Sequence, residues 1–278
     1  MTIREIIKSF EVFDGQYKRE AVDAALAVQA EITPVLLEIL EKVANEPGTY
    51  SKNNKYYAHL YAVHLLSHFK ETKAHDLLVR LFGLPKELPF DLFGDMVTES
   101  LPAILYSTCG GSLNKIKEMI LNENVNEYCR SGALQAITYA VANEKVSRES
   151  VIDFFASFFA ENEKRMELGL VYTSLVNACC DIYPEELMPQ IERAYEHEFI
   201  DELWINLDDI KSALRMGKEN TFFYLKEKMA HYLPTDFHRR MSWWACFDQN
   251  KSQSVFSKFS SPVKLKIPSK KRSKKKSK

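Results

Sequence analysis

Apolar residues recur along the chain at spacings of three and four, the pattern of helices that bury one face. Between Val151 and Phe159 they occupy positions i, i+3, i+4, i+7 and i+8, a stripe wide enough to cover a neighbouring helix. The period-two alternation typical of half-buried strands is not sustained anywhere in the sequence. The pattern therefore predicts an all-α chain.

The predicted helices are arranged as a repeated pair. Small residues stand at equivalent points on the first helix of five units, and each is followed four residues later by another apolar or small residue. These points are Ala24, Ala62, Ser100, Ala133 and Ser174. Second helices are predicted to begin near Val35, Leu77, Ile116, Val151 and Leu187. The unit length is in the range of HEAT-type arrays, so we expect a HEAT-like α-α superhelix, or solenoid, of about five to six hairpins.

Local signals place the helix boundaries and the breaks between units. Thr33-Pro34 is predicted to begin a helix, since Thr can cap it and Pro fits the first turn. Ser147 is predicted to cap the helix that holds the phenylalanine stripe, and Gly110-Gly111 to separate two helices. A sixth, less regular unit is expected between Trp204 and Tyr232.

Charge divides the chain into two parts. Residues 251–278 contain 11 of the 37 Lys and Arg residues and none of the 38 Asp and Glu residues. The first 250 residues therefore carry a net charge of about −12 and the tail +11. Such a tail cannot bury enough apolar surface to offset the entropy of ordering. We expect a helical-repeat solenoid over residues 1–250 and a disordered lysine-rich tail over 251–278.

The composition of the chain indicates where in the cell the protein is located. The longest uncharged stretch, Ser100–Asn114, is too short to cross a bilayer, so no membrane span is predicted. Arg4, Glu5 and Lys8 exclude a secretory apolar segment at the N-terminus. The 5 cysteines are odd in number and lack framework spacing, which is typical of a reducing compartment. We expect a cytoplasmic protein.

Five dispersed segments resemble a bacterial family named domain of unknown function 1186. They are ITPVLLEIL (32–40), GDMVTESL (94–101), NEYCRSGAL (126–134), DIYPEEL (181–187) and MSWWACF (241–247). The resemblance covers about residues 1–247 and implies a helical superhelix without supplying a reaction. Many relatives end in a cysteine-rich SEC-C zinc motif, but this chain has no Cys or His after Cys246. The resemblance therefore does not imply that this chain binds zinc.

Candidate chemistry is sparse. His59, His64, His68 and His75 cluster in the second unit, and His64 with His68 have the i, i+4 spacing of two metal ligands. No Glu follows His64 where a metalloprotease helix needs its base, so capping or partly exposed histidines are the favoured interpretation. Cys179-Cys180 has no nearby cation to favour a thiolate, which favours buried packing. We predict no metal site, no cofactor and no catalytic residues.

Other residues fit recognition better. Asp95 and Glu99 share one predicted helix face, and stacking could bring them to Arg130 of the next unit, as a pocket or, preferably, as an ion pair between repeats. Trp243-Trp244 forms an aromatic pair that we expect to cap the last repeat, with a stacking platform as the alternative.

Two functions remain. The favoured one is a non-enzymatic interaction scaffold whose acidic body binds basic or amphipathic protein partners. The alternative is a protein that binds RNA, DNA or the ribosome through its basic tail, by releasing counterions. The tail residues expected to contact phosphates are Lys270, Lys271, Arg272, Lys274, Lys275 and Lys276. For the tail itself, the other interpretation is that it only aids solubility or folds onto the acidic body.

Overall fold

The structure is a computed structural model that describes residues 1–162, 165 and 168–247. Within these ranges every regular element is a helix, and the only strand-like pairings are the isolated bridges Val12–Tyr56 and Pro85–Val125. The all-α prediction is confirmed. In the same ranges, no helix combines the length and the apolarity that crossing a membrane requires.

Helices occupy the segments of the five predicted pairs in the described part of the chain. Their first helices are α2 (Arg19–Ala27), α5 (Ala58–His68), α9 (Leu101–Thr108), α11 (Glu127–Ala142) and α13 (Gly169–Asp181). Their second helices are α3 (Gln29–Asn45), α6 (His75–Phe82), α10 (Asn114–Leu121), α12 (Arg148–Glu161) and α14 (Met188–Glu196). Shorter elements join or flank them: α1 (Ile3–Glu11), α4 (Pro47–Tyr50), η1 (Thr72–Ala74), α7 (Leu88–Phe93), α8 (Met96–Glu99) and η3 (Glu185–Leu187).

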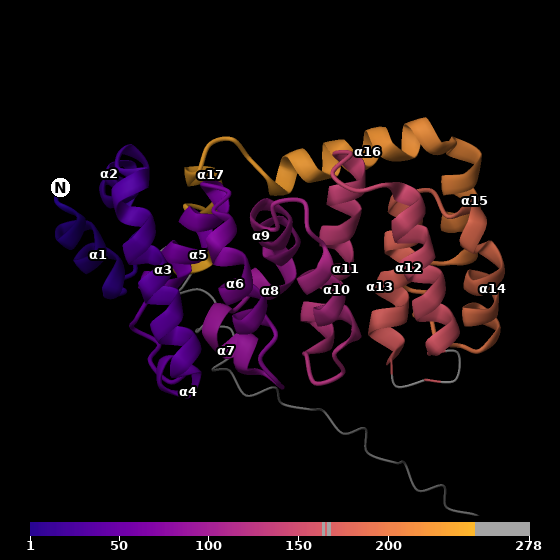
Figure 1. Cartoon of the computed structure of the whole chain (residues 1–278), viewed down its shortest axis with the longest axis horizontal. Coiled ribbons are helices and arrows are strands. Elements are labelled where there is room, and N and C mark those ends of the chain that lie inside the picture. The colour runs from indigo at the N-terminus through magenta and orange to yellow at the C-terminus, as the bar shows by residue number, and fades with distance from the viewer. Residues whose placement is uncertain (163–164, 166–167, 248–278) are drawn as a thin grey trace, which may run out of the picture.

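These pairs follow one another in chain order along the long axis of the molecule (Figure 1). Helix α5 packs on α9, α9 on α11 and α11 on α13, while α3, α6 and α10 form consecutive contacts beside them. Gly132 lets α11 approach α9 closely, because a Cβ at this position would lie 3.0 Å from a methyl carbon of Leu101. The phenylalanine stripe of α12 packs as expected, with Phe155, Phe158 and Phe159 buried.

Two of the three boundary signals are confirmed. The Ser147 hydroxyl accepts a hydrogen bond from the Ser150 amide at the start of α12. Gly110 and Gly111 both have positive φ, at 60° and 91°, as a tight break between helices requires. The prediction at Thr33-Pro34 is wrong: α3 begins at Gln29, and the Thr33 hydroxyl donates to the Gln29 carbonyl inside the helix.

The last helices do not extend the array as a sixth stacked pair. Helix α15 (Leu207–Met216) is followed by α16 (Lys218–Tyr232), which runs back along the molecule and contacts α13 and α11 (Figure 1). Its buried face consists of Thr221, Leu225 and Met229, spaced four residues apart. Consequently, everything after Tyr232 is carried toward the first pairs of the array.

We call residues 233–247 the return segment; it includes α17 (His238–Met241) and η4 (Ala245–Phe247). Phe237 and Met241 are its buried anchors, with 2% and 0% of their surface exposed. His238 ties the segment to the N-terminal pairs: Tyr17 Oη lies 2.8 Å from its Nδ1 and Asp23 Oδ1 2.9 Å from its Nε2. The return segment therefore closes the C-terminal part of the described chain onto its beginning.

Candidate functional site

Two neighbouring cavities lie where the return segment crosses α5, α8 and the start of α9. Cavity I has a volume of about 620 Å³, and cavity II has a volume of about 550 Å³. Glu99, Ser100 and Trp243 line both. Each volume is in the range that ligand-binding pockets occupy, so this region is the candidate site.

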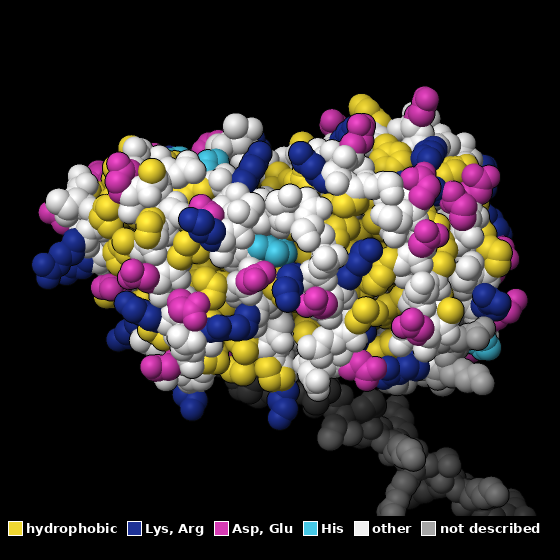
Figure 2. Space-filling model, in the orientation of Figure 1, with side chains coloured by type: hydrophobic (Ala, Val, Ile, Leu, Met, Phe, Trp, Pro, Cys, Tyr) yellow, Lys and Arg dark blue, Asp and Glu magenta, His cyan; other side chains and the backbone are white. Residues whose placement is uncertain are grey.

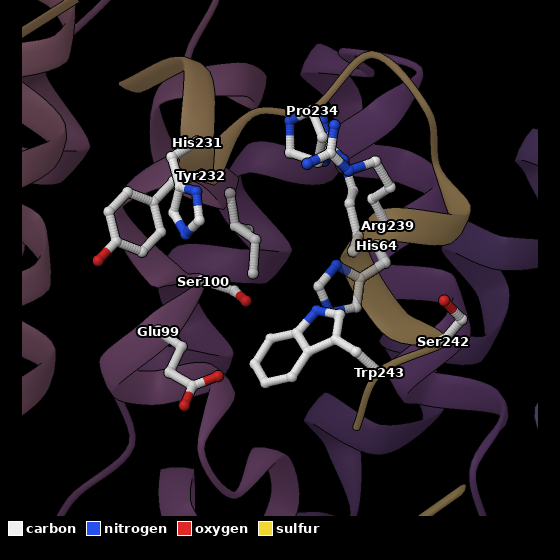
Figure 3. A pocket seen from close by; sticks show the side chains of 11 residues that line it. His64, Glu99, Ser100, His231, Tyr232, Pro234, Arg239, Ser242 and Trp243 are labelled. Atoms are coloured by element: carbon white, nitrogen blue, oxygen red, sulfur yellow. The ribbon is translucent and has the colours of Figure 1, made fainter. Parts of the chain in front are cut away.

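Cavity I has a basic wall. His64 comes from α5, His231 from the end of α16, and Arg239 and Arg240 from α17. Figure 3 shows Glu99 and His231 on one side of a common space, with His64 and Trp243 across from them. The return segment thus supplies most of the charge in this cavity.

Arg240 is a shielded guanidinium without an acidic partner. Its one hydrogen bond within the described residues runs from Nη1 to Ser67 Oγ, at 3.4 Å, and its buried Nε has no partner there. No carboxylate of the described residues forms an ion pair with it. Burial lowers the pKa of Arg240 to about 10. Uncompensated buried charge is costly, so this group is available to a ligand.

His64 contributes a second unpartnered group to cavity I. Only 2% of its surface is exposed, and its Nε2 has no hydrogen-bond partner. Burial, and then the nearby Arg240 charge, lower the pKa of His64 to about 3, so the ring is neutral at pH 7. The Trp244 ring contacts it edge-on at a centroid distance of 5.3 Å. The imidazole is therefore held in place with one nitrogen unused.

Cavity II is aromatic and acidic. Among the described residues no Lys or Arg lines it, while Asp91, Asp95 and Glu99 do. Burial raises the pKa of Glu99, and the Asp95 charge adds to the rise. The aromatic residues in its wall are Tyr50, Tyr56, Tyr57, Phe90, Phe93, Trp243 and Trp244. Carboxylates beside aromatic faces favour a cationic group with an apolar stem.

The structure corrects the expected position of the tryptophan pair. Trp243 and Trp244 do not cap the last repeat; they lie over α5 and line cavity II, and Trp244 stacks on Phe247. The reason is the reversal of α16, which brings the chain back to the early pairs. Trp243 remains 60% exposed, as a recognition residue requires.

The expected approach of Arg130 to Asp95 and Glu99 is also wrong. Arg130 is buried and its Nε donates to the Ile120 carbonyl over 2.8 Å, at the end of α10. A cation there neutralises the negative end of that helix. Among the described residues Arg130 forms no ion pair with either acid, which instead line cavity II.

The remaining histidines and cysteines have structural surroundings. His59 Nε2 donates to the Leu92 carbonyl over 2.7 Å, and His75 Nδ1 lies 3.0 Å from Thr108 Oγ1. The His68 ring contacts Phe237 edge-on. Burial raises the pKa of Cys180 to about 12 and raises that of Cys179 well above its usual value. The described residues contain no group of three or more His, Cys, Asp or Glu arranged to hold a metal ion.

Sequence reasoning missed the basic wall of cavity I. Arg239 and Arg240 directly precede the MSWWACF segment, and this adjacency was the available signal. Two of the segments that carry the family resemblance, 94–101 and 241–247, supply residues to both cavities. The predicted phosphate-contacting residues lie outside the described residues: Lys270, Lys271, Arg272, Lys274, Lys275 and Lys276.

Comparisons with known proteins agree on one family. The family described as Protein of unknown function (DUF1186) matches residues 1–248. An uncharacterized protein of Chlamydia trachomatis serovar D is 32% identical over 230 residues, which cover 83% of this chain and 90% of the relative. An uncharacterized protein of Chlamydia muridarum is 33% identical over 215 residues, or 77% and 85% of the two chains. No solved structure matches. This chain therefore belongs to the DUF1186 family.

Proposed function

We propose that this protein is a non-enzymatic interaction scaffold that holds a basic, partly apolar segment of a partner protein in cavity II. The observation that carries the proposal is the composition of that cavity: three carboxylates, a wall of aromatic rings and, within the part of the chain that the structure describes, no Lys or Arg. A Lys or Arg side chain can lay its stem on the rings and bring its charge to Asp95 or Glu99. The net charge of −12 over the first 250 residues supports the same partner class.

The state of the candidate catalytic groups also supports a binding role. Burial lowers the pKa of His59 to about 4, far from the value near 7 that suits a general base. Burial likewise raises the pKa of all five thiols, so a thiolate nucleophile is disfavoured at Cys109, Cys129, Cys179, Cys180 and Cys246. All five cysteines are unpaired, as in a reducing cytoplasmic compartment, where we place the scaffold.

Peptides of defined charge test the proposal. We expect the intrinsic tryptophan fluorescence to change saturably with a nine-residue peptide of Lys and Phe, and not with the matched peptide of Glu and Phe. The double change Asp95→Asn and Glu99→Gln keeps side-chain volume while removing both charges. It should weaken binding of the Lys peptide about tenfold, equivalent to ~1.4 kcal/mol.

Asp153→Asn is the matched control, because Asp153 is an exposed carboxylate on α12, outside both cavities. Its affinity for the Lys peptide should stay within about twofold of the unmodified protein, since the two sites share no contact. Equal binding of the Lys and Glu peptides would refute the charge argument. Unchanged affinity in the double variant would remove cavity II from the interaction.

Nucleic-acid binding through the tail remains a second proposal, motivated by the 11 basic residues of 251–278. On the face drawn in Figure 2, Lys and Arg side chains alternate with Asp and Glu and form no broad basic patch. We expect full-length protein to bind RNA or DNA without sequence preference, with an affinity that falls steeply as salt rises. A protein truncated after residue 250 should lose this binding. Equal binding by the truncated protein would instead assign it to the array.

Charge reversal tests whether nucleic-acid binding requires the positive charge of the tail and not only the presence of the tail. The six predicted phosphate-contacting residues would be changed to Glu together, and the melting temperature should not move. They are Lys270, Lys271, Arg272, Lys274, Lys275 and Lys276. Retained nucleic-acid affinity in this variant would contradict phosphate contact by these side chains.

A further inference from the structure

Cavity I combines two buried polar groups that nothing else in the described chain uses. The His64 side chain is 2% exposed with a free Nε2, and the Arg240 Nε is shielded and free. A guanidinium has five N–H donors, and Arg240 uses one of them, in a bond of 3.4 Å to Ser67. Buried polar groups are nearly always satisfied, so two unpartnered nitrogens that lie just behind a cavity wall, almost out of contact with its space, point to a ligand whose binding brings them into hydrogen bonds.

The net charge of cavity I indicates the charge of the ligand that it would bind. Its lining contains the guanidinium groups of Arg239 and Arg240 and the carboxylate of Glu99, a formal charge of +1 for these three groups. Neither arginine forms an ion pair with a carboxylate of the described residues. A singly charged anion balances this charge, whereas a phosphate dianion exceeds it.

Shape and wall chemistry agree with an organic anion. The guanidinium fork matches the planar, two-oxygen geometry of a carboxylate. Ile104 and the Trp243 indole provide apolar walls, and the volume of about 620 Å³ leaves room for more than the charged group. We propose that cavity I binds an organic monocarboxylate, whose oxygens take hydrogen bonds from Arg240 and His64 and whose apolar body lies against Trp243.

A carboxylate of this kind has two sources: a small metabolite, or the free C-terminus of a protein chain. Both present the same group to Arg240, so the chemistry of the site is common to them. Glu99 and Trp243 line both cavities, but Arg240 does not line cavity II and Asp95 does not line cavity I, so changes at these two residues test the two proposals separately. Loss of Lys-peptide binding in the single variant Asp95→Asn therefore leaves the Arg240 measurement to be judged by itself.

Calorimetric titration of the full-length protein tests the site with sodium benzoate, sodium acetate and inorganic phosphate. Benzoate should bind saturably and more tightly than acetate, because only benzoate fills the apolar part of the cavity. Phosphate should bind more weakly than benzoate. A peptide ending in Phe with a free carboxylate, titrated beside its C-terminal amide, distinguishes the two sources: preference for the free acid over benzoate indicates a chain terminus, and the reverse indicates a metabolite.

Variants at Arg240 identify the binding group. Arg240→Gln should weaken benzoate at least tenfold, the loss expected for hydrogen bonds to a charged partner. Arg240→Lys should restore part of the affinity, since it keeps the charge without the fork. Arg215→Gln is the matched control: Arg215 is exposed on α15 and bonds only to Ser212 within the described residues. Its benzoate affinity should not change.

Nuclear magnetic resonance of the imidazole signals provides a readout that a purely structural role of Arg240 would not move. The His64 signals should shift saturably with benzoate, with the same dissociation constant as calorimetry, and His64→Ala should weaken benzoate while Arg215→Gln does not. Absence of saturable binding by every carboxylate, equal affinity in Arg240→Gln, or tighter binding of phosphate than of benzoate would each overturn the assignment.

Discussion

Replacing Phe237 with alanine is expected to lower the free energy of unfolding by about 3–5 kcal/mol, the usual cost of removing a buried phenyl ring. Phe237 is 2% exposed and its ring meets His68 of α5 edge-on at a centroid distance of 5.4 Å. With Met241, it is one of the two buried residues that anchor the return segment on the early helices. The same change should abolish benzoate binding, because Arg239, Arg240 and Trp243 all follow Phe237 in the return segment.

Urea denaturation followed by circular dichroism measures this loss, and amide hydrogen exchange over residues 233–247 shows where it occurs. Phe223→Ala is the matched control, since Phe223 lies on α16 with 59% of its surface exposed. That change should alter stability by less than about 1 kcal/mol. A loss below about 1 kcal/mol for Phe237→Ala would show that the return segment is not anchored there.

Replacing Arg148 with alanine is expected to destabilise the chain by about 2–4 kcal/mol, chiefly because the Ile182 and Tyr183 carbonyls lose their hydrogen-bond donor. Arg148 is buried at the start of α12, and its Nε donates to the Ile182 carbonyl over 2.7 Å. Its two terminal nitrogens donate to the Glu186 carboxylate, and one of them also donates to the Tyr183 carbonyl. The side chain thus joins α12 to the turn before α14.

The pH dependence of stability tests the ion pair between Arg148 and Glu186. Hydrogen bonds from Arg148 lower the pKa of Glu186 from 4.5 to about 2 in the folded protein. A lowered folded-state pKa contributes stability that is full above about pH 4.5 and is lost as the pH falls toward 2. Because Glu186 is half-exposed, solvent screening reduces this contribution below what the pKa change alone implies. In Arg148→Ala this part of the acid sensitivity should disappear.

Arg80→Ala supplies the comparison for Arg148. Arg80 pairs with Glu41 at 3.4 Å between two half-exposed side chains, so its removal should cost less than about 1 kcal/mol. Urea unfolding at pH 7 and at pH 3 measures the stability of the unmodified protein, of Arg148→Ala and of Arg80→Ala. Equal losses for the two arginine variants, or unchanged acid sensitivity in Arg148→Ala, would contradict the structural role assigned to Arg148.

Several residues of the candidate site were predictable from the sequence, but their arrangement around the cavities was not. Asp95, Glu99, Trp243 and Trp244 were selected from the sequence as recognition residues, and the structure brings all four to cavity II. That these four residues line one cavity was not predictable, because the sequence pattern placed the tryptophans at the far end of the array. The buried spacing of Thr221, Leu225 and Met229 suits a sixth stacked helix as well as a returning one.

The sequence by itself determined the all-α class and the positions of most helices. Periodicity of apolar residues, the cap at Ser147 and the glycines at 110 and 111 act within a few residues, so they specify a helix wherever the chain lies. Only the tertiary structure decided where cavities form. His64, Glu99 and Arg240 meet because α16 buries one face against α11 and α13 and so reverses the chain. That choice depends on contacts between residues far apart in sequence, which no local pattern encodes.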